Sequence, residues 1–500
     1  MTMAVLRLVL LCLCVHVTSP LSTPPPSPPP PRPPTPSRIK TTRNYLEAAA
    51  LSSKLASNSP AAPKSVAVIG GGLSGLACAK YLADAGHVPT VYEARKVLGG
   101  KVSAWKDSDG DWIETGLHIF FGAYPNMMNL FSELKIEDRL QWKPHRMTFA
   151  MQQYPGRFTS FDFPPNVPAP LNMAAAILGN NDMLSLLDKV AMVPGLLPML
   201  LEGQDFIDRQ DEKSVSEFME EYNMPSSVRT ELFIAMGKAL DFVDPDKLSM
   251  TVILTAMNRF INEADGSQTA FLDGNQPSRL CAPLRSSIEA RGGSVLLGSP
   301  VSAIVAGEDG RVCHLLMRDG TKVVADEFVS AMPVDVFKRI VPEAWSHMPY
   351  FRQLDELEGI PVINLQLWFS TKLRAVDGLC FSRSPLLSVY ADMSVCCAEY
   401  SDDDSTMLSL VFAPCNAQAG ASRDWIKASD EEIVDAAMGE LARLFPEEIG
   451  YDPSWPSTSE QRRRAGARAL LRKHSVVRVP RSVYAATPGR NKFRPGQKTP

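Results

Sequence analysis

The sequence lacks any apolar run long enough to cross a membrane. A spanning helix needs about 20 consecutive apolar residues. The longest nearly uninterrupted apolar stretch after the first residues is Val190–Leu201, only twelve residues long. We therefore predict no transmembrane segment, and we expect Pro194 and Pro198 to interrupt a helix there.

Cysteine is scarce and has no metal-binding pattern. The chain has 9 cysteines in 500 residues, and none of them forms a C-x2-C pair. Cys12 and Cys14 lie near the start, and the odd, scattered remainder indicates reduced thiols rather than a disulfide framework. The 7 histidines form no cluster with ligand spacing, so we predict no metal site.

The sequence also lacks a large excess of charge of either sign. Lys and Arg number 51 against 55 Asp and Glu, which gives a net charge of -4. This balance offers no electrostatic basis for binding a nucleic acid. The length and the hydrophobic fraction of 45% fit a globular protein of two or three domains.

Acidic residues are absent before Glu47, whereas basic and hydroxyl side chains occur throughout that region. Val5–Val17 has the length of a signal-peptide core, and Pro20–Pro36 is too rich in proline to pack. We predict that residues 1–64 form a disordered two-part leader for a plastid. A plain secretory signal is the alternative.

A glycine motif between a strand and a helix dominates what is present. Val66–Ile69 is predicted to be a buried parallel strand, and Ser74–Ala85 a helix that Gly86 ends. Between them Gly70, Gly72 and Gly75 have the spacing G-x-G-x-x-G, and a second strand, Val88–Tyr92, leads to Glu93.

This arrangement predicts a dinucleotide-binding unit. The first glycine permits a tight turn, the second lets the backbone approach a pyrophosphate, and the third lets helix and strand pack closely. Amide groups at the helix start, including those of Leu73 and Ser74, bind phosphate oxygens in such units. Glu93 is placed to accept hydrogen bonds from a ribose.

The residues after Glu93 identify the dinucleotide. The pattern Glu93-x5-Gly99-Gly100-Lys101 resembles the extended signature of flavoproteins in the amine-oxidase and carotenoid-desaturase superfamily. In that group the Gly-Gly turn brings backbone and a cation near the FAD pyrophosphate. The resemblance therefore implies FAD rather than NAD.

Longer strings resemble the carotenoid desaturase family, in its phytoene-desaturating plant and algal branch. The likeness covers nearly everything from Ser65 to Tyr484. It is carried by Asp109–Phe131, Arg139–Lys143, Pro168–Asn172, Phe271–Asn275, Leu387–Ser394 and Pro480–Tyr484.

This resemblance implies an activity and a set of contacts. The expected reaction is FAD-dependent desaturation of phytoene, a C40 hydrocarbon, to zeta-carotene via phytofluene, with plastoquinone as the electron acceptor. No catalytic side chain is expected. The expected substrate-binding residues are Arg259 and Phe121. The expected cofactor-binding residues are Gly70, Gly72, Leu73, Ser74, Gly75, Glu93, Ala94, Lys101, Gly116, His118, Ile119 and Tyr124.

Three other functions stay open: zeta-carotene desaturation, amine oxidation, and an inactive flavin-fold protein. The oligomeric state is also open. From the residues alone, Arg259 lies off the apolar face of its helix and pairs with Glu263 at i, i+4, as a solvated ion pair would. Val190–Leu201 is either the core of a helical part, a tunnel wall, or a surface that enters one membrane leaflet.

The predicted fold class is α/β. It combines a discontinuous, Rossmann-like FAD-binding domain of the glutathione-reductase type with a second, α+β substrate domain. Arg462–Lys473 is expected to be a solvated helix face. The tail after Tyr484 lacks the Gly-Asp strand and helix of the family, and we expect a truncated or aberrant end. The boundaries are 1–64 (leader), 65–150 (FAD-binding, first part), 151–280 (helical, membrane-associating), 281–345 (FAD-binding, return segment), 346–485 (substrate domain) and 486–500 (tail).

Overall fold

The computed structural model describes residues 38–58, 60–151, 156–165, 167–263, 265–374, 376–449 and 468–495. The predicted signal core, the proline-rich tract and the first part of Arg462–Lys473 lie outside the described residues. Within the described ranges, no helix combines the length and the apolar character needed to cross a bilayer.

A four-stranded parallel sheet, in the order β10-β2-β1-β14, carries the glycine motif. Its members are β1 (Ser65–Ile69), β2 (Val88–Tyr92), β10 (Ser294–Leu296) and β14 (Glu327–Ser330). The first two strands confirm the sequence prediction, and the other two come from more than 200 residues later in the chain.

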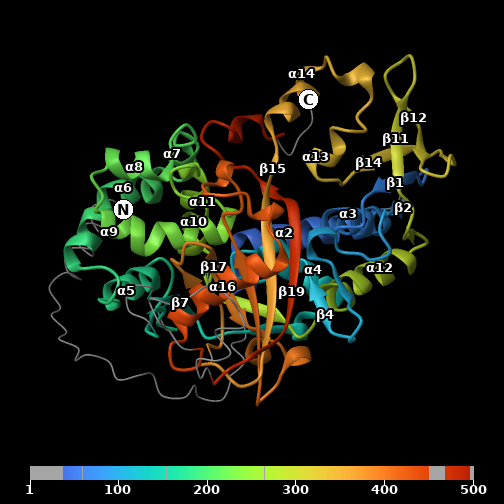
Figure 1. Cartoon of the computed structure of the whole chain (residues 1–500). Helices are drawn as coiled ribbons and strands as arrows, with labels where there is room; N and C mark the ends of the chain where they lie inside the picture. The colour runs from blue at the N-terminus through green and yellow to red at the C-terminus, as the bar shows by residue number, and fades with distance from the viewer. Residues whose placement is uncertain are drawn as a thin grey trace. The chain divides into compact units, whose positions relative to one another are not determined.

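Alternate residues of β1 face two different layers, as the two-residue period of a strand requires. Val66 and Val68 pack with α3 (Leu73–Asp84), α4 (Pro125–Leu134) and α12 (Ala282–Glu289). Ala67 and Ile69 pack against a small antiparallel sheet, β11-β12-β13. That sheet consists of β11 (Val301–Ala306), β12 (Val312–Met317) and β13 (Lys322–Val323), with turns at Gly310 and Gly320. Figure 1 shows α3 and α12 beside β1 and β2.

The segment before β1 corrects the prediction that residues up to 64 lie outside the fold. Residues 38–58 include a single 3-10 turn, η1 (Ile39–Thr41), and α2 (Arg43–Ala56). Ile39 is 1% exposed and Tyr45 is buried, in the same core as Val66 and Val68. The acid-free composition that suggests a leader therefore continues into a helix that packs on α3 and α4.

A mainly helical part follows the first sheet, as predicted. It consists of α5 (Leu171–Gly179), α6 (Leu186–Glu202), α7 (Gln204–Asp208), α8 (Val215–Glu221), α9 (Ser226–Val228), α10 (Ile234–Asp241) and α11 (Met250–Asn262). The expected interruption at Pro194 and Pro198 is wrong, because α6 continues through both. Its buried face packs closely: a Cβ at Gly195 would overlap Met224.

The same helix presents an exposed apolar face. Met192 and Met199 are buried, whereas Leu187 is 79% exposed. The members of this exposed face recur at helical spacing: Leu186, Leu187, Val190, Val193, Leu200 and Leu201. The predicted core thus accounts for one side of Val190–Leu201 only.

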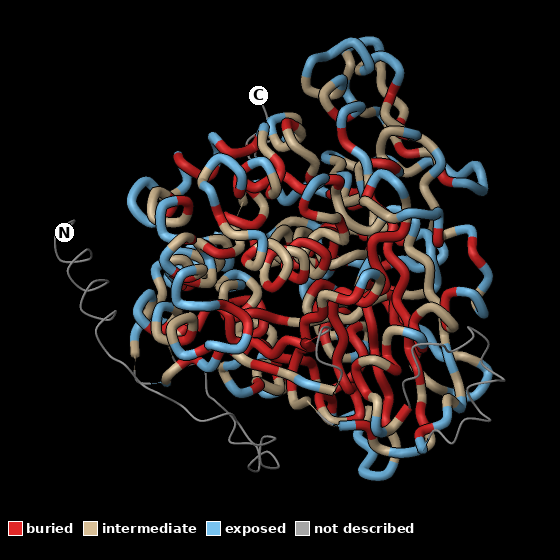
Figure 2. Tube along the Cα trace, turned by 60° about the vertical axis from the view of Figure 1, so that its left-hand side comes forward, coloured by how far each residue is buried: buried red, intermediate tan, exposed pale blue. Residues whose placement is uncertain are grey.

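A seven-stranded sheet forms the second large layer, in the order β19-β15-β18-β17-β16-β7-β8. Its strands are β7 (Arg146–Ala150), β8 (Phe158–Asp162), β15 (Gly359–Phe369), β16 (Cys380–Ser382), β17 (Leu387–Asp392), β18 (Thr406–Phe412) and β19 (Leu471–Tyr484). One face packs on α16 (Asp430–Leu444), and the other packs on the helical part. Figure 2 shows buried residues gathered along strands and exposed residues at the rim.

Short strands connect the two layers. A hairpin is formed by β3 (Ala104–Lys106) and β4 (Trp112–Glu114), and a small sheet by β5 (Phe120–Phe121), β9 (Thr269–Leu272) and β6 (Leu140–Trp142). Side-chain amides of β15 bond the backbone of β4: Asn364 donates to the Glu114 carbonyl (3.1 Å), and the Glu114 amide donates to Gln366 Oε1 (2.8 Å). Shorter helices between β14 and β18 are α13 (Val334–Phe337), α14 (Pro349–Arg352) and α15 (Met393–Cys396).

One prediction near the C-terminus needs correction. Lys473 lies in strand β19, not on a helix. Its ammonium group lies 2.5–2.8 Å from carboxylates of Asp107, Asp109 and Asp111, and these bonds outweigh its burial and raise its pKa. In the described part of the tail, the Gly489 amide donates to the Asp211 carbonyl (2.8 Å). The prediction of a truncated or aberrant end is not tested by this contact.

Candidate functional site

The turn between β1 and α3 has the geometry that its three glycines predict. Gly70 has a φ of +109°, a conformation that disfavours side chains. A Cβ on Gly75 would overlap the Gly70 carbonyl oxygen, so the third glycine is what lets helix and strand approach. Gly72 is the N-cap of α3 and supplies no side-chain cap. Gly72 forms an isolated parallel bridge with Gly99. The amide groups of Ser74 and Gly75, in the first turn of the helix, have no carbonyl four residues earlier inside the helix.

The Gly-Gly turn lies directly against this glycine turn. Gly99 and Gly100 have φ values of +106° and +60°. The Gly99 amide donates to the Gly71 carbonyl (2.9 Å), and the nearest atoms to a Cβ on Gly72 would belong to these two glycines, at 3.7 Å or more. At Gly72 the start of α3 therefore faces backbone rather than side chains, as a pyrophosphate requires.

Glu93 is buried and ties the turns together. Its two carboxylate oxygens accept from the Gly71 amide (2.7 Å) and the Arg95 amide (2.9 Å). A carboxylate has about four acceptor positions, so these bonds leave capacity for ribose hydroxyls. The ribose contact remains a prediction. Ala94, next in the chain, is exposed.

Lys101, Gly116 and His118 are brought together by the hairpin that follows. The His118 ring contacts the Lys101 carbonyl through Nε2 (3.1 Å) and Glu114 through Nδ1 (3.2 Å). Glu114 is buried and also accepts from the Tyr400 hydroxyl (2.6 Å). Burial, with a further contribution from the Glu114 carboxylate, raises the pKa of Tyr400. Desolvation of the ammonium group by the surrounding protein lowers the pKa of Lys101, and the negative charge of Asp335 opposes this effect. This network holds the Gly-Gly turn to the body of the protein.

The dinucleotide FAD fits this cradle. A flavin dinucleotide needs unshielded amides for its phosphates, a close backbone and an acceptor for its ribose. The glycine turn, the Gly-Gly turn and Glu93 offer these three features. No ligand-binding role is assigned to Gly116, His118 or Ile119 by their contacts, so those assignments remain predictions.

Phe121 and Tyr124 lie on an apolar stretch beside α11. The Phe121 ring is 5.6 Å from the Tyr124 ring and 5.2 Å from the Phe260 ring, measured between centroids. Phe121 is buried, and Ile119 packs partly buried among neighbouring apolar residues. Tyr124 is 42% exposed. The protein around its hydroxyl group partly desolvates that group and raises its pKa. Phe260 adjoins Arg259, which places the two predicted substrate residues on neighbouring elements.

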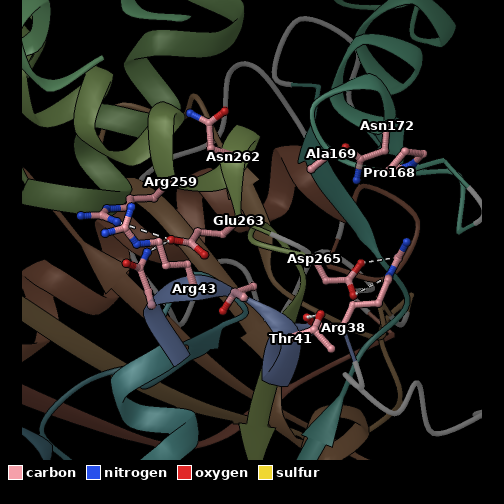
Figure 3. Close-up of a pocket in the computed structure, with 12 residues that line it drawn as sticks. Arg38, Thr41, Arg43, Pro168, Ala169, Asn172, Arg259, Asn262, Glu263 and Asp265 are labelled. Atoms are coloured by element: carbon pink, nitrogen blue, oxygen red, sulfur yellow. Dashed lines mark hydrogen bonds and ion pairs between the residues drawn. The ribbon is translucent and has the colours of Figure 1, made fainter. Parts of the chain in front are cut away.

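Arg259 lines a pocket of about 490 Å³ (Figure 3). Three segments form its wall: residues 38–44, the C-terminal end of α11 with the following loop, and the start of α5. As predicted, Arg259 pairs with Glu263, but loosely: Nη1 is 3.4 Å from Oε1 and the side chain is 53% exposed. Arg38 faces Asp265 and bonds it through two nitrogens.

Sequence reasoning missed the residues opposite Arg259. Arg38 and Asn44 fall in the segment assigned to the leader, and Asp265 follows the end of α11. Glu263 was singled out, but only as the i, i+4 partner of Arg259. No motif in the sequence indicates that these segments meet. Glu114 and Tyr400 were also missed, although Glu114 lies inside a string that carries the resemblance.

Among the described residues, three aspartates lie close enough together to hold a metal ion: Asp107, Asp109 and Asp111. It surrounds the Lys473 ammonium group. The chain thus provides the cation of this cluster itself.

Comparison with known proteins reveals close relatives. Residues 73–500 match the family described as flavin containing amine oxidoreductase. The 15-cis-phytoene desaturase, chloroplastic/chromoplastic, of Capsicum annuum is 53% identical over 464 residues, which cover 92% of this chain and 76% of that protein. The 15-cis-phytoene desaturase of Synechococcus elongatus is 53% identical over 441 residues, 87% of this chain and 88% of that protein.

More distant matches follow. The zeta-carotene desaturase of Synechocystis is 29% identical over 468 residues, 87% of this chain and 90% of that protein. A solved putrescine oxidase, a variant with redesigned cofactor binding, is 17% identical with a TM-score of 0.56, and the match covers 84% of this chain and 85% of that one. At this identity the structure shows a shared mixed α/β fold alone.

Proposed function

The chain belongs to the flavin containing amine oxidoreductases, and on that basis we propose that it is an FAD-dependent enzyme that desaturates 15-cis-phytoene to zeta-carotene via phytofluene. The observation that carries the proposal is 53% identity, over 87–92% of the chain, to two 15-cis-phytoene desaturases. Identity to a zeta-carotene desaturase is 29%, which makes the next desaturation the weaker candidate.

We infer that the parallel sheet with its two covering layers is a discontinuous FAD-binding domain of the glutathione-reductase type. The strand order supports this, since β10 and β14 return beside β2 and β1. Gly70, Gly72 and Gly75, with the amides of Leu73 and Ser74, would hold the pyrophosphate. Glu93 and Ala94 would hold the ribose side, and Lys101 would place a cation near the phosphates.

When bound, FAD supplies the acceptor for a hydride from an allylic carbon of the hydrocarbon. The chain contributes position and exclusion of water. Phe121, Phe260 and their apolar neighbours form an apolar surface against which a hydrocarbon could pack, and the shape of that surface would determine which carbon is presented. We assign no proton-transferring side chain.

Arg259 would bind the polar end of the electron acceptor, for which we propose plastoquinone. Its guanidinium group has five N–H donors, and its loose contact with Glu263 leaves donors for a quinone oxygen. A hydrocarbon offers no acceptor for these donors. The pocket that contains Arg259 is thus suited to the quinone rather than to phytoene.

The exposed apolar face of α6 supports peripheral membrane contact. Both proposed substrates are carried in a membrane, and the apolar side chains of this face have no partner on the described chain that buries them. A surface of this kind enters one leaflet without spanning it. A plastid location is proposed from the chloroplastic relative.

The decisive experiment is reconstituted turnover. The full chain, supplied with FAD and vesicles that contain 15-cis-phytoene and decylplastoquinone, should yield phytofluene and then zeta-carotene on chromatography. NAD in place of the quinone should give no product. Turnover of zeta-carotene but not of phytoene would instead indicate the next desaturation, and a chain that stays colourless with excess FAD would contradict both.

A further inference from the structure

Residues Arg38–Asn44, the N-terminal strap, form one wall of the Arg259 pocket although they precede the first strand of the fold. Ile39 anchors the strap in the core at 1% exposure. Arg38 bonds Asp265 through Nε (3.0 Å) and a second nitrogen. The strap therefore has a fixed position opposite the end of α11 (Figure 3).

The three arginines of the pocket differ in how tightly they are paired. Arg38 has the two bonds to Asp265, and Arg43 pairs with Glu47 at 2.6 Å. Arg259 has the 3.4 Å contact with Glu263, longer than an ordinary charge-assisted bond of about 2.7–2.9 Å. Of these three arginines, Arg259 thus has the longest contact with a carboxylate, which leaves donors of its guanidinium group for a ligand.

Asn44 accounts for this loose contact. Its side-chain amide donates to Glu263 Oε1, the same oxygen that Arg259 Nη1 approaches. The Glu263 side chain is 9% exposed, so its charge needs donors from the protein. Because Asn44 supplies one donor, the carboxylate is satisfied without drawing in the whole guanidinium group.

We propose that Asn44 is a positioning residue that keeps the Arg259 guanidinium available in the pocket by occupying Glu263. Without the Asn44 amide, Glu263 would form a tight two-pronged pair with Arg259 and remove its donors from the pocket. The consequence for the electron acceptor rests on the proposed function, but the positioning itself does not.

The first test reads the guanidinium group directly in the full-length chain. Phenylglyoxal modifies accessible arginines, and peptide mass spectrometry gives a rate for each site. Asn44→Leu should slow the labelling of Arg259 by about threefold or more, since a tight ion pair protects the guanidinium group. Arg43 provides an internal reference, and its rate should not change.

Two further variants separate positioning from general damage. Ser52 lies on α2, the helix that also carries Asn44, but away from the pocket, and its hydroxyl accepts a hydrogen bond from Asn129. Ser52→Ala removes this bond and should leave Arg259 labelling unchanged. Adding Glu263→Gln to Asn44→Leu removes the competing charge and should restore the labelling rate. Unchanged or faster labelling in Asn44→Leu, or no restoration in the double variant, would overturn the proposal.

Kinetics then connect the strap to the reaction. In the phytoene assay, Asn44→Leu should raise KM for decylplastoquinone about threefold or more and leave kcat within about twofold, because only binding of the acceptor is weakened. Slower labelling with an unchanged KM would support the positioning role and contradict the assignment of Arg259 to the quinone. Failure of the wild-type chain to desaturate phytoene would leave the labelling test intact.

Discussion

A hydrogen atom in place of a side chain decides whether the nucleotide cradle can form. At Gly75 the helix approaches the preceding strand so closely that a methyl group would overlap a backbone carbonyl. Backbone cannot yield as a flexible side chain can. At Gly439, inside α16, no atom lies within 4 Å of the same added methyl group.

Gly75→Ala and Gly439→Ala should therefore have opposite effects. The first should lower the free energy of unfolding by more than about 3 kcal/mol and abolish retention of FAD, because helix and strand are forced apart. The second should raise it by about 0.5–1 kcal/mol, because alanine is the better helix former. Urea denaturation and flavin absorbance after desalting measure both. Equal effects of the two substitutions would contradict this interpretation of the turn.

Asp241, the last residue of α10, has a carboxylate oxygen that is buried without a hydrogen-bond partner. Burial raises its pKa to about 7, against a partial opposing effect of Arg494. The Tyr484 hydroxyl nearby is also buried and unpartnered. The folded protein therefore favours the protonated form of this group.

The stability of the chain should depend on pH through Asp241. Between its unfolded pKa of about 4 and its folded pKa of about 7, the folded state binds the additional proton. The free energy of unfolding should accordingly fall as pH rises from 5 to 8, by an amount on the order of a few kcal/mol. Asp241→Asn should remove this part of the decline. Urea denaturation at both pH values tests it, and parallel losses in the wild type and the variant would contradict the assignment.

The elements themselves follow local rules except where packing overrides them. Helix α6 continues through two prolines because one side, with Met192, Gly195 and Met199, is held in the core. Its other side stays apolar and exposed. On α2, Leu46 and Leu51 are exposed as well, at 56% and 60%, but they lie on a helix with charged neighbours.

Helix α6 rather than α2 should provide the membrane contact. Leu187→Asp with Val190→Asp should reduce co-sedimentation with vesicles of phosphatidylcholine and phosphatidylglycerol by about tenfold, because two carboxylates oppose entry into the leaflet. Both side chains are exposed, so the free energy of unfolding should change by less than about 1 kcal/mol. Leu46→Asp with Leu51→Asp is the matched control and should leave vesicle binding unchanged. Equal losses for both pairs would indicate a non-specific effect of charge.

The described molecule is assembled from segments that are distant in sequence. The parallel sheet joins residues 65–92 to residues 294–330, and the seven-stranded sheet joins residues 146–162 to residues 359–412 and 471–484. Residues 38–58 pack on the first of these assemblies and complete the Arg259 pocket. The N-terminal strap and its helix thus belong to the fold.

Removal of residues 38–58 should cost stability. A chain that begins at Pro60 should unfold at least about 3 kcal/mol more easily than one that begins at Arg38, because Ile39 and Tyr45 each bury a side chain worth about 1.5–3 kcal/mol. Urea denaturation of the two chains measures the difference. Equal free energies of unfolding for the two chains would contradict the conclusion that residues 38–58 contribute to the stability of the fold.

Local patterns were enough to predict the cradle and most elements around it. The glycine spacing, the strand before it and the acid after the second strand are all within 30 residues, and each acts through backbone geometry that neighbours in sequence determine. Glu93 was singled out for a ribose contact, which stays a prediction, and its observed partners are backbone amides.

Contacts between distant segments depend on packing that no local pattern encodes. The burial of Ile39, the continuity of α6 across Pro194, the strand conformation of Lys473 and the shared hold of Asn44 and Arg259 on one carboxylate are of this kind. Each is decided by what lies across the interface, since the free energy comes from apolar area and charge brought together by the fold. Consecutive residues thus determine the nucleotide cradle by themselves. The pocket around Arg259 forms only when the tertiary structure brings together segments more than 200 residues apart.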